Sequence, residues 1–238
     1  MGSSLITHRI GTAGWTIPAK PDRQGSHLFQ YAQTLNCAEI NSSFYRPHRP
    51  ATWARWAAET PENFRFSVKA PKTITHEAKL VGCEALLTAF LEQLGPMEPK
   101  LGPLLFQLPP SLAFDVGVAV EFLAMLRSLY GGEVALEPRH ASWFGPGADQ
   151  LLESHGIARV AADPAKVPEA AMPSGDRRLV YYRLHGSPRM YYSSYEGGFL
   201  SELSGRIMDH PNAWVIFDNT AHGHAFGDAL RLKELLKS

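Results

Sequence analysis

The segment LVYYRLH, residues 179–185, alternates between two kinds of side chain. In an extended chain, one face would carry Val180, Tyr182 and Leu184, and the other face Tyr181, Arg183 and His185. This period of two residues is typical of a β-strand. Because an apolar face packs well against helices, Arg183 and His185 are expected to point away from the helices, into the interior of a closed sheet.

Short apolar segments of this kind recur and alternate with helical segments. The predicted strands are residues 8–14, 37–45, 65–70, 104–108, 134–137, 158–163, 179–185 and 213–218. The predicted helices are residues 26–35, 51–59, 84–94, 115–130, 148–154, 201–209 and 224–236, and residues 164–178 are predicted to form a loop. Strands that alternate with helices form parallel sheets, and eight such units in 238 residues are close to the size of about 250 residues that is usual for a barrel. The sequence therefore predicts an α/β protein, a single closed (β/α)8 TIM barrel of eight parallel strands that spans residues 1–238.

Composition argues against several classes of protein. The 23 basic and 23 acidic residues give a net charge of +0, which argues against a broad surface for nucleic acid or anionic membranes. Cys37 and Cys83 form no C-x-x-C pair, and the first ten residues lack the apolar run of a signal peptide. No stretch approaches the roughly 20 apolar residues of a membrane span. We therefore expect a cytoplasmic protein that does not enter a membrane.

Polar side chains gather at the ends of the predicted strands. The alternation rule points Glu39, Asn41, Lys69, Gln107, Glu137 and Arg139 into the barrel, and two further strands end at Asp163 and at Asp218-Asn219. These positions lie toward the carboxyl ends of the strands, where barrels of this kind build their active sites. Burying each charge costs several kcal/mol unless it is paired. Two interpretations follow, a salt-bridge network that fills the barrel or a charged pocket that meets a ligand, and for the whole set we favour the pocket.

Seven motifs, spread in order over nearly the whole chain, resemble those of one family. They are IGTAGW (residues 10–15), AEINSSFYRP (38–47), FSVKAPKTITH (66–76), LLFQLPPS (104–111), LEPRHASWF (136–144), YYRLHG (181–186) and FDNTAHGHA (217–225). Together they resemble the YecE-like family, also called domain of unknown function 72. The resemblance implies a fold similar to the α/β barrels of the xylose-isomerase and endonuclease IV type. It implies no particular reaction, because likeness of fold alone does not carry chemistry.

The first functional hypothesis is an enzyme that uses acid/base chemistry on a small anionic substrate bearing a phosphate or a carboxylate. The residues expected to bind this substrate are Lys69, Arg139, Arg183, Gln107, Asn41, Asn219 and Tyr45. The residues expected to act as acid or base are Glu137, His185, Glu39 and Asp163. For Glu137, burial raises the pKa while neighbouring arginines lower it. We expect the arginines to prevail, so that Glu137 stays charged.

Two other hypotheses come from different classes of protein. The first is a metal-dependent phosphoesterase resembling barrels of the endonuclease IV type. Its ligands would be Glu137, Asp163, His185 and Asp218. Three cations in the same place argue against it, so no cofactor is expected, although a divalent metal would be compatible with these residues. The second is a non-catalytic protein that binds a nucleotide, a sugar or single-stranded nucleic acid by stacking on aromatic loop residues, and the net neutrality argues against strong affinity for nucleic acid.

Overall fold

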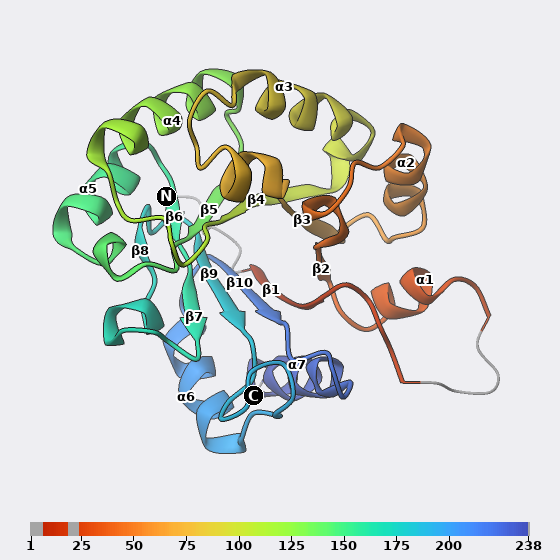
Figure 1. The fold of residues 1–238 in the computed structure, drawn as a ribbon. Coiled ribbons are helices and arrows are strands. Elements are labelled where there is room, and N and C mark those ends of the chain that lie inside the picture. The colour runs from red at the N-terminus through yellow and green to blue at the C-terminus, as the bar shows by residue number, and fades with distance from the viewer. Residues whose placement is uncertain (1–6, 19–23, 238) are drawn as a thin grey trace, which may run out of the picture.

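The computed structural model of the chain describes residues 7–18 and 24–237. Ten strands form one sheet in the order β7-β9-β10-β1-β2-β3-β4-β5-β6-β8. Their bounds are β1 Thr7–Ala13, β2 Cys37–Ile40, β3 Arg65–Lys69, β4 Leu101–Gln107, β5 Val134–Glu137, β6 Ala158–Arg159, β7 Ala161–Asp163, β8 Ser174–Gly175, β9 Val180–Leu184 and β10 Asn212–Phe217. All neighbouring strands are parallel except β6 and β8, and the sheet curls into a nearly closed barrel (Figure 1).

The predicted sixth strand brings the two sides of the barrel together. Its first part, β6, pairs with β5, and its second part, β7, pairs with β9, with Val160 between them. Each of the eight predicted segments contains strand, but the prediction of eight unbroken parallel strands is only partly right. The sixth segment is split in two, and β8 adds an antiparallel pair within residues that were predicted to form a loop. Gly175 allows this pairing, because it has a φ of +67° and a Cβ there would lie 2.4 Å from the Ile157 carbonyl oxygen.

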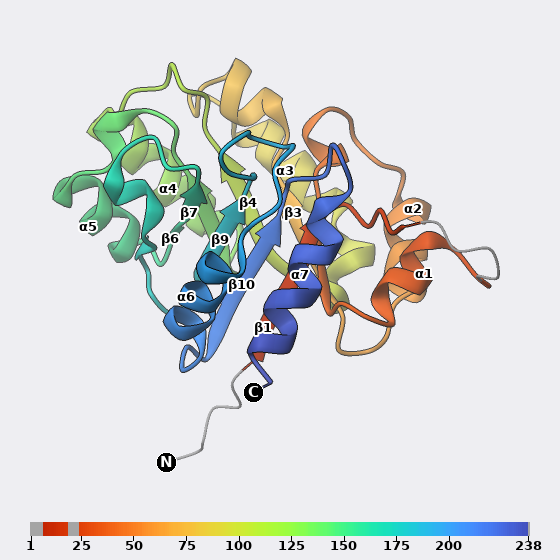
Figure 2. The same ribbon diagram turned by 90° about the horizontal axis from the view of Figure 1, so that it is seen from below.

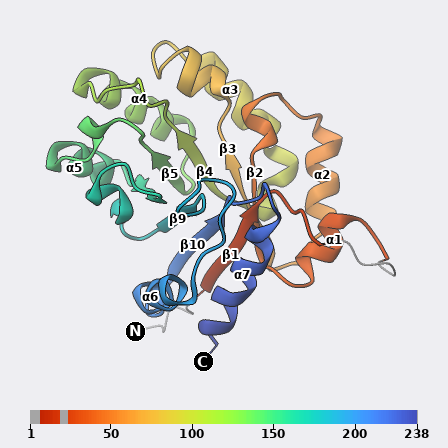
Figure 3. The ribbon, with the colours of Figure 1, turned by 60° about the horizontal axis from the view of Figure 1, so that its bottom comes forward.

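Helices cover the outer side of the sheet. They are α1 His27–Ala32, α2 Pro50–Ala58, α3 Glu84–Gln93, α4 Val116–Leu129, α5 Pro146–Ser154, α6 Gly197–Ile207 and α7 His224–Leu235. Helix α7 lies along β1 and β10 (Figure 2), and α2 to α5 follow one another around the other side of the barrel (Figure 3). No helix in the described part of the chain is long and apolar enough to cross a bilayer.

The barrel interior has two layers. Toward the amino ends of the strands it is apolar, and there Tyr181 stacks on Trp214 with ring centroids 6.1 Å apart. Gly102 makes room for the indole, because a Cβ at this position would lie 2.5 Å from the Trp214 ring. Toward the carboxyl ends the interior is charged, and Glu39, Glu137 and Arg183 are fully buried there. A layer of packed rings and aliphatic side chains therefore lies directly beneath the charged layer inside the barrel.

Candidate functional site

Arg183 on β9 is the centre of the charged layer, and its side chain is 1% exposed. Its Nε and Nη2 donate to the two carboxylate oxygens of Glu39 on β2, at 3.0 and 2.7 Å. Its Nη1 donates to Glu137 Oε2 at 2.7 Å, and Nη2 also lies 3.2 Å from Oδ2 of Asp218, just after β10. Burial lowers the pKa of Arg183, but the three carboxylates raise it well above its ordinary value. The guanidinium therefore stays charged, with its donors turned toward protein carboxylates.

Glu137, at the end of β5, is held by two arginines. Besides its contact with Arg183, its Oε1 lies 2.6 Å from Arg139 Nη2, and Gln107 Nε2 donates to its Oε2 at 3.2 Å. Burial raises the pKa of Glu137, but Arg183 and Arg139 together lower it well below its ordinary value. This direction agrees with the expectation that the buried carboxylate stays charged.

His185 follows β9 and joins Asp218 to Arg139. Its Nδ1 lies 3.0 Å from Asp218 Oδ2, and its Nε2 lies 3.1 Å from Arg139 Nη2 and 3.4 Å from Glu137 Oε1. Arginine only donates, so a neutral imidazole would accept from Arg139 at Nε2 and donate from Nδ1 to Asp218. Burial raises the pKa of Asp218, but the hydrogen bond with His185 and the charge of Arg183 lower it by more, so the pKa lies below its ordinary value. The imidazole is thus oriented by a charged carboxylate, with its basic nitrogen beside Arg139.

Lys69, the last residue of β3, is the third cation, and its side chain is 8% exposed. Its ammonium donates to Gln107 Oε1 at 2.6 Å and lies 4.1 Å from the centroid of the Phe44 ring. In the part of the chain that the structure describes, no carboxylate lies within 4.0 Å of this ammonium. Burial and the charge of Arg183 lower the pKa of Lys69 to about 8, and Glu39, Glu137 and Asp218 oppose this only in part.

These contacts form one continuous set, the mouth cluster, which we define as Glu39, Lys69, Gln107, Glu137, Arg139, Arg183, His185 and Asp218. Its three carboxylates balance its three cations when His185 is neutral. Five members lie on strands β2, β3, β4, β5 and β9, and the other three follow the carboxyl ends of β5, β9 and β10. Strand alternation predicts this arrangement. Arg139 differs from Arg183, because its side chain is 13% exposed and its buried Nε has no hydrogen-bond partner among the described residues.

Four predicted site residues lie apart from the mouth cluster. Asp163 pairs in register with Leu184, so it faces the helices, where its Oδ1 accepts from the Tyr195 hydroxyl at 2.9 Å. The Asn219 amide is buried beside the cluster but donates to Ser193 and Asp228. Tyr45 is 71% exposed, and Asn41 makes no hydrogen bond to the cluster among the described residues. Both follow the end of β2 at Ile40, where the predicted longer strand gives way to a helical turn, Ser42–Phe44.

The position of Asp163 also separates the residues that could have held a metal. Glu137, His185 and Asp218 are in contact, while Asp163 faces the other side of the sheet. Within residues 7–18 and 24–237, no group of three or more His, Cys, Asp or Glu side chains has an arrangement that could hold a metal ion.

Three aromatic side chains of the site were not among the residues predicted to bind or react, although Tyr191 is one of the aromatic loop residues considered for a non-catalytic binding protein. The Tyr181 hydroxyl lies 2.8 Å from Glu39 Oε2 and 2.8 Å from Ser67 Oγ, so it donates its single proton to the carboxylate and accepts from the serine. Phe44 lies under the ammonium of Lys69, and the Tyr191 ring is 5.8 Å from the His185 ring. Tyr181 shares the face of Arg183 and could have been found from the alternation, whereas Phe44 and Tyr191 come from loops that carry no periodic signal.

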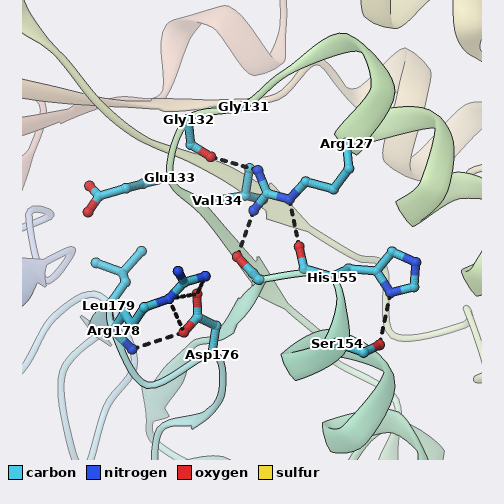
Figure 4. Close-up of a pocket in the computed structure, with 11 residues that line it drawn as sticks. Arg127, Gly131, Gly132, Glu133, Val134, Ser154, His155, Asp176, Arg178 and Leu179 are labelled. Atoms are coloured by element: carbon cyan, nitrogen blue, oxygen red, sulfur yellow. Dashed lines mark hydrogen bonds and ion pairs between the residues drawn. The ribbon is translucent and has the colours of Figure 1, made fainter.

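A separate cavity of about 580 Å³ lies at the amino ends of the strands (Figure 4). Arg127, from α4, donates there to four backbone carbonyl oxygens, those of Tyr130, Gly132, His155 and Gly156. Arg178, which is 84% exposed, pairs with Asp176 at 2.8 Å. The two arginines of this cavity thus have partners within the protein and connect the loops at this end of the barrel.

The motifs and the barrel both agree with the comparisons with known proteins. The chain matches the family described as "Protein of unknown function DUF72" over residues 9–238. The chain belongs to the DUF72 family. The resemblance inferred from the motifs is therefore confirmed.

Named DUF72 relatives include the UPF0759 protein YecE of Escherichia coli, which is 31% identical over 173 residues. That match covers 70% of this chain and 62% of YecE, so the chain spans less than two thirds of that relative's length. The UPF0759 protein YunF of Bacillus subtilis is 27% identical over an alignment of 270 residues that covers 95% of this chain and 94% of YunF.

Solved DUF72 structures share the fold. A DUF72 family protein from Enterococcus faecalis superposes with a TM-score of 0.82 at 24% identity, covering 98% of this chain and 96% of that one. One from Thermotoga maritima gives a TM-score of 0.78 at 26% identity, with coverages of 97% and 99%. The chain thus shares its fold with these two DUF72 proteins.

Proposed function

We propose that this DUF72 protein is an enzyme that binds a small anionic substrate at the mouth of the barrel and moves a proton by way of His185. The observation that carries the proposal is the row of contacts Asp218–His185–Arg139, in which the imidazole is oriented by a carboxylate and faces a guanidinium with an unpaired donor. Phosphate and carboxylate groups are the chemical classes that match such a guanidinium.

Arg139 is the group we assign to the substrate anion. A network that only fills a barrel is most stable when each buried donor has a partner, and Arg183 meets this condition. Arg139 does not, because its buried Nε finds no hydrogen-bond partner within residues 7–18 and 24–237, while its Nη2 contacts Glu137 and His185. A bound anion would supply the missing acceptor, while Glu137 keeps the guanidinium in place.

His185 is the group we assign to proton transfer. When an anion engages Arg139, the Nε2 lone pair is released to take a proton from the substrate, and Asp218 stabilises the imidazolium that forms. Glu39 is committed to Arg183 and Tyr181, so its part is to hold Arg183 rather than to react. Lys69 and Gln107 connect to the same residues from β3 and β4, because Lys69 donates to Gln107 and Gln107 donates to Glu137.

Inorganic phosphate tests the anion site directly. Binding to the folded protein should raise the melting temperature by mass action, with about 2.7 kcal/mol of stabilisation when phosphate reaches 100 times its dissociation constant. Arg139→Gln should abolish the shift. Arg178→Gln removes the same charge from the opposite end of the barrel and should keep it. An unchanged shift in Arg139→Gln, or no shift in the unmodified protein, would exclude this anion site.

Proton transfer is tested with a panel of small phosphorylated and carboxylated compounds. We expect His185→Gln to leave the phosphate-induced shift in place while lowering turnover of any substrate found by about 10²-fold or more. A His185→Gln variant with full turnover would remove the imidazole from the reaction.

A further inference from the structure

Lys69 is a buried amine with no carboxylate within 4.0 Å of its nitrogen among the residues that the structure describes. Buried lysines are rare unless they are paired with a carboxylate. The three carboxylates of the mouth cluster are all engaged by Arg183, at distances of 2.7 to 3.2 Å. Lys69 instead has an amide oxygen at 2.6 Å and an aromatic face at 4.1 Å. An uncharged donor could make the same hydrogen bond to Gln107, so the presence of an ionisable amine at this buried position calls for a further explanation.

The surroundings of Lys69 increase the fraction of its amine that is neutral and nucleophilic. Burial and Arg183 act together on the ammonium, and the resulting pKa of about 8 leaves roughly a quarter of the amine unprotonated at pH 7.5. An ordinary exposed lysine has only about one part in a thousand in that form. Desolvation next to another cation is a known way to activate a lysine as a nucleophile.

The contacts of Lys69 also suit a cation formed later on the same nitrogen. The Gln107 carbonyl oxygen accepts one N–H and leaves the lone pair of the neutral amine pointing elsewhere. The Phe44 ring presents its face, which stabilises a positive charge on that nitrogen. Glu39, Glu137 and Asp218 add a negative field at longer range.

We propose that Lys69 forms a Schiff base with a small carbonyl compound that carries an anionic group. The Nζ lone pair attacks the carbonyl carbon, and a C–N bond forms. The carbonyl oxygen then leaves as water with one proton from the amine and one from an acid in the medium or the site, which gives a protonated imine whose remaining N–H donates to Gln107. The choice of an anionic carbonyl rests on the proposed function, since Arg139 would hold the anion.

Reductive trapping tests the proposal on the whole protein. The protein is incubated with pyruvate, glyoxylate or glycolaldehyde phosphate and sodium cyanoborohydride, and the modified lysines are located by peptide mass mapping. We expect Lys69 to react at least about tenfold faster than Lys72, an exposed lysine three residues away that pairs with Glu77. The rate of trapping should rise with pH around a midpoint near 8.

Two variants separate the possible results. Lys69→Arg keeps the charge and should lose the adduct, while Lys72→Arg should keep it. Equal labelling of Lys69 and Lys72, or no preference for Lys69 with any of the three compounds, would overturn the Schiff-base proposal. The phosphate-induced melting shift reports on Arg139 and should persist in Lys69→Arg, so failure of the lysine chemistry and failure of the anion site give different results.

Discussion

At the amino ends of the strands Arg127 donates to four backbone carbonyl oxygens, whereas at the carboxyl ends Arg183 donates to three carboxylates. Arg127 ties together loops that lie within about thirty residues of it. Arg183 joins side chains that are up to 144 residues away in the sequence. The two arginines therefore stabilise the protein in different ways, one through neutral dipoles and one through full charges.

The difference bears on where chemistry can take place. Backbone carbonyl oxygens do not titrate, so the contacts of Arg127 at the amino ends do not change with pH. Carboxylates hold protons and can exchange partners, so the carboxyl end can respond to a ligand. Arg139 and Lys69 both lie at this responsive end, and in the described part of the chain the Arg139 Nε has no hydrogen-bond partner and the Lys69 ammonium has no carboxylate within 4.0 Å.

The largest effect should come from Arg183→Met. Glu39 and Glu137 would be left buried without their main counter-charge, and we expect a loss of about 3–5 kcal/mol in the free energy of unfolding, measured by urea denaturation at pH 7. Adding Glu137→Gln to this variant should recover part of the loss, because it removes one of the uncompensated charges. A loss below 1 kcal/mol, with no recovery in the double variant, would show that the mouth cluster does not act as one network.

Glu137→Gln should have the next largest effect. It keeps the shape of the side chain and removes one of three carboxylates from Arg183, so we expect a loss of about 2 kcal/mol at pH 7. Since folding lowers the pKa of Glu137, its contribution is complete above the unfolded value of 4.5 and declines as the pH falls toward the folded value. The difference between the unmodified protein and the variant should therefore shrink below pH 4.5. A difference that stays constant down to pH 3 would contradict the assigned charge.

Arg127→Met tests the other end of the barrel. Four carbonyl oxygens would lose a donor, with an expected loss of about 1–2 kcal/mol. Because none of its acceptors titrates, this loss should be the same at pH 5 and pH 7. An acid-dependent loss like that of Glu137→Gln would remove the distinction between the two ends.

Lys69→Met should have the smallest effect and the opposite sign. Removing a buried ammonium without a carboxylate should raise the free energy of unfolding by about 1 kcal/mol at pH 7. Folding lowers the pKa of Lys69 from 10.5 to about 8, so the unmodified protein gains stability as the pH rises from 8 to 10.5, and the advantage of the variant should fade over that interval. The pKa of neighbouring Arg183 is raised and the pKa values of Glu137, Asp218 and His76 are lowered, so these groups keep constant charge over that interval. A destabilised variant at pH 7 would assign Lys69 a structural role.

Strand alternation was enough to predict most of the mouth cluster. It placed Glu39, Lys69, Glu137 and Arg183 on the inner face, because each lies on a strand with an apolar opposite face. It also gave the end of the barrel at which they meet, since parallel strands share the direction of their carboxyl ends. The pattern does not say which carboxylate meets which cation, so the pairing of His185 with Asp218 had to come from the structure.

The errors have local causes. Asp163 was assigned to the site because it ends a strand, yet Ala158 and Val160 face the interior and Asp163, at odd spacing from them, faces outward. Tyr45 was assigned to an extended strand, but β2 is only four residues long. Residues 164–178 lack periodicity, and their antiparallel pair depends on the close approach of Gly175 to a backbone carbonyl.

The position of Arg183 late in the chain has a consequence for how the protein is made. A ribosome synthesises Glu39 and then Glu137 before Arg183, so the early strands alone would have to bury two carboxylates with no cation from β9 to meet them. A folding intermediate that contains only the early strands is therefore expected to be unstable, and the barrel is expected to fold cooperatively once β9 is present. Pulse-labelled hydrogen exchange during refolding should show β2 and β5 becoming protected together with β9, and early protection of β2 and β5 alone would refute this order.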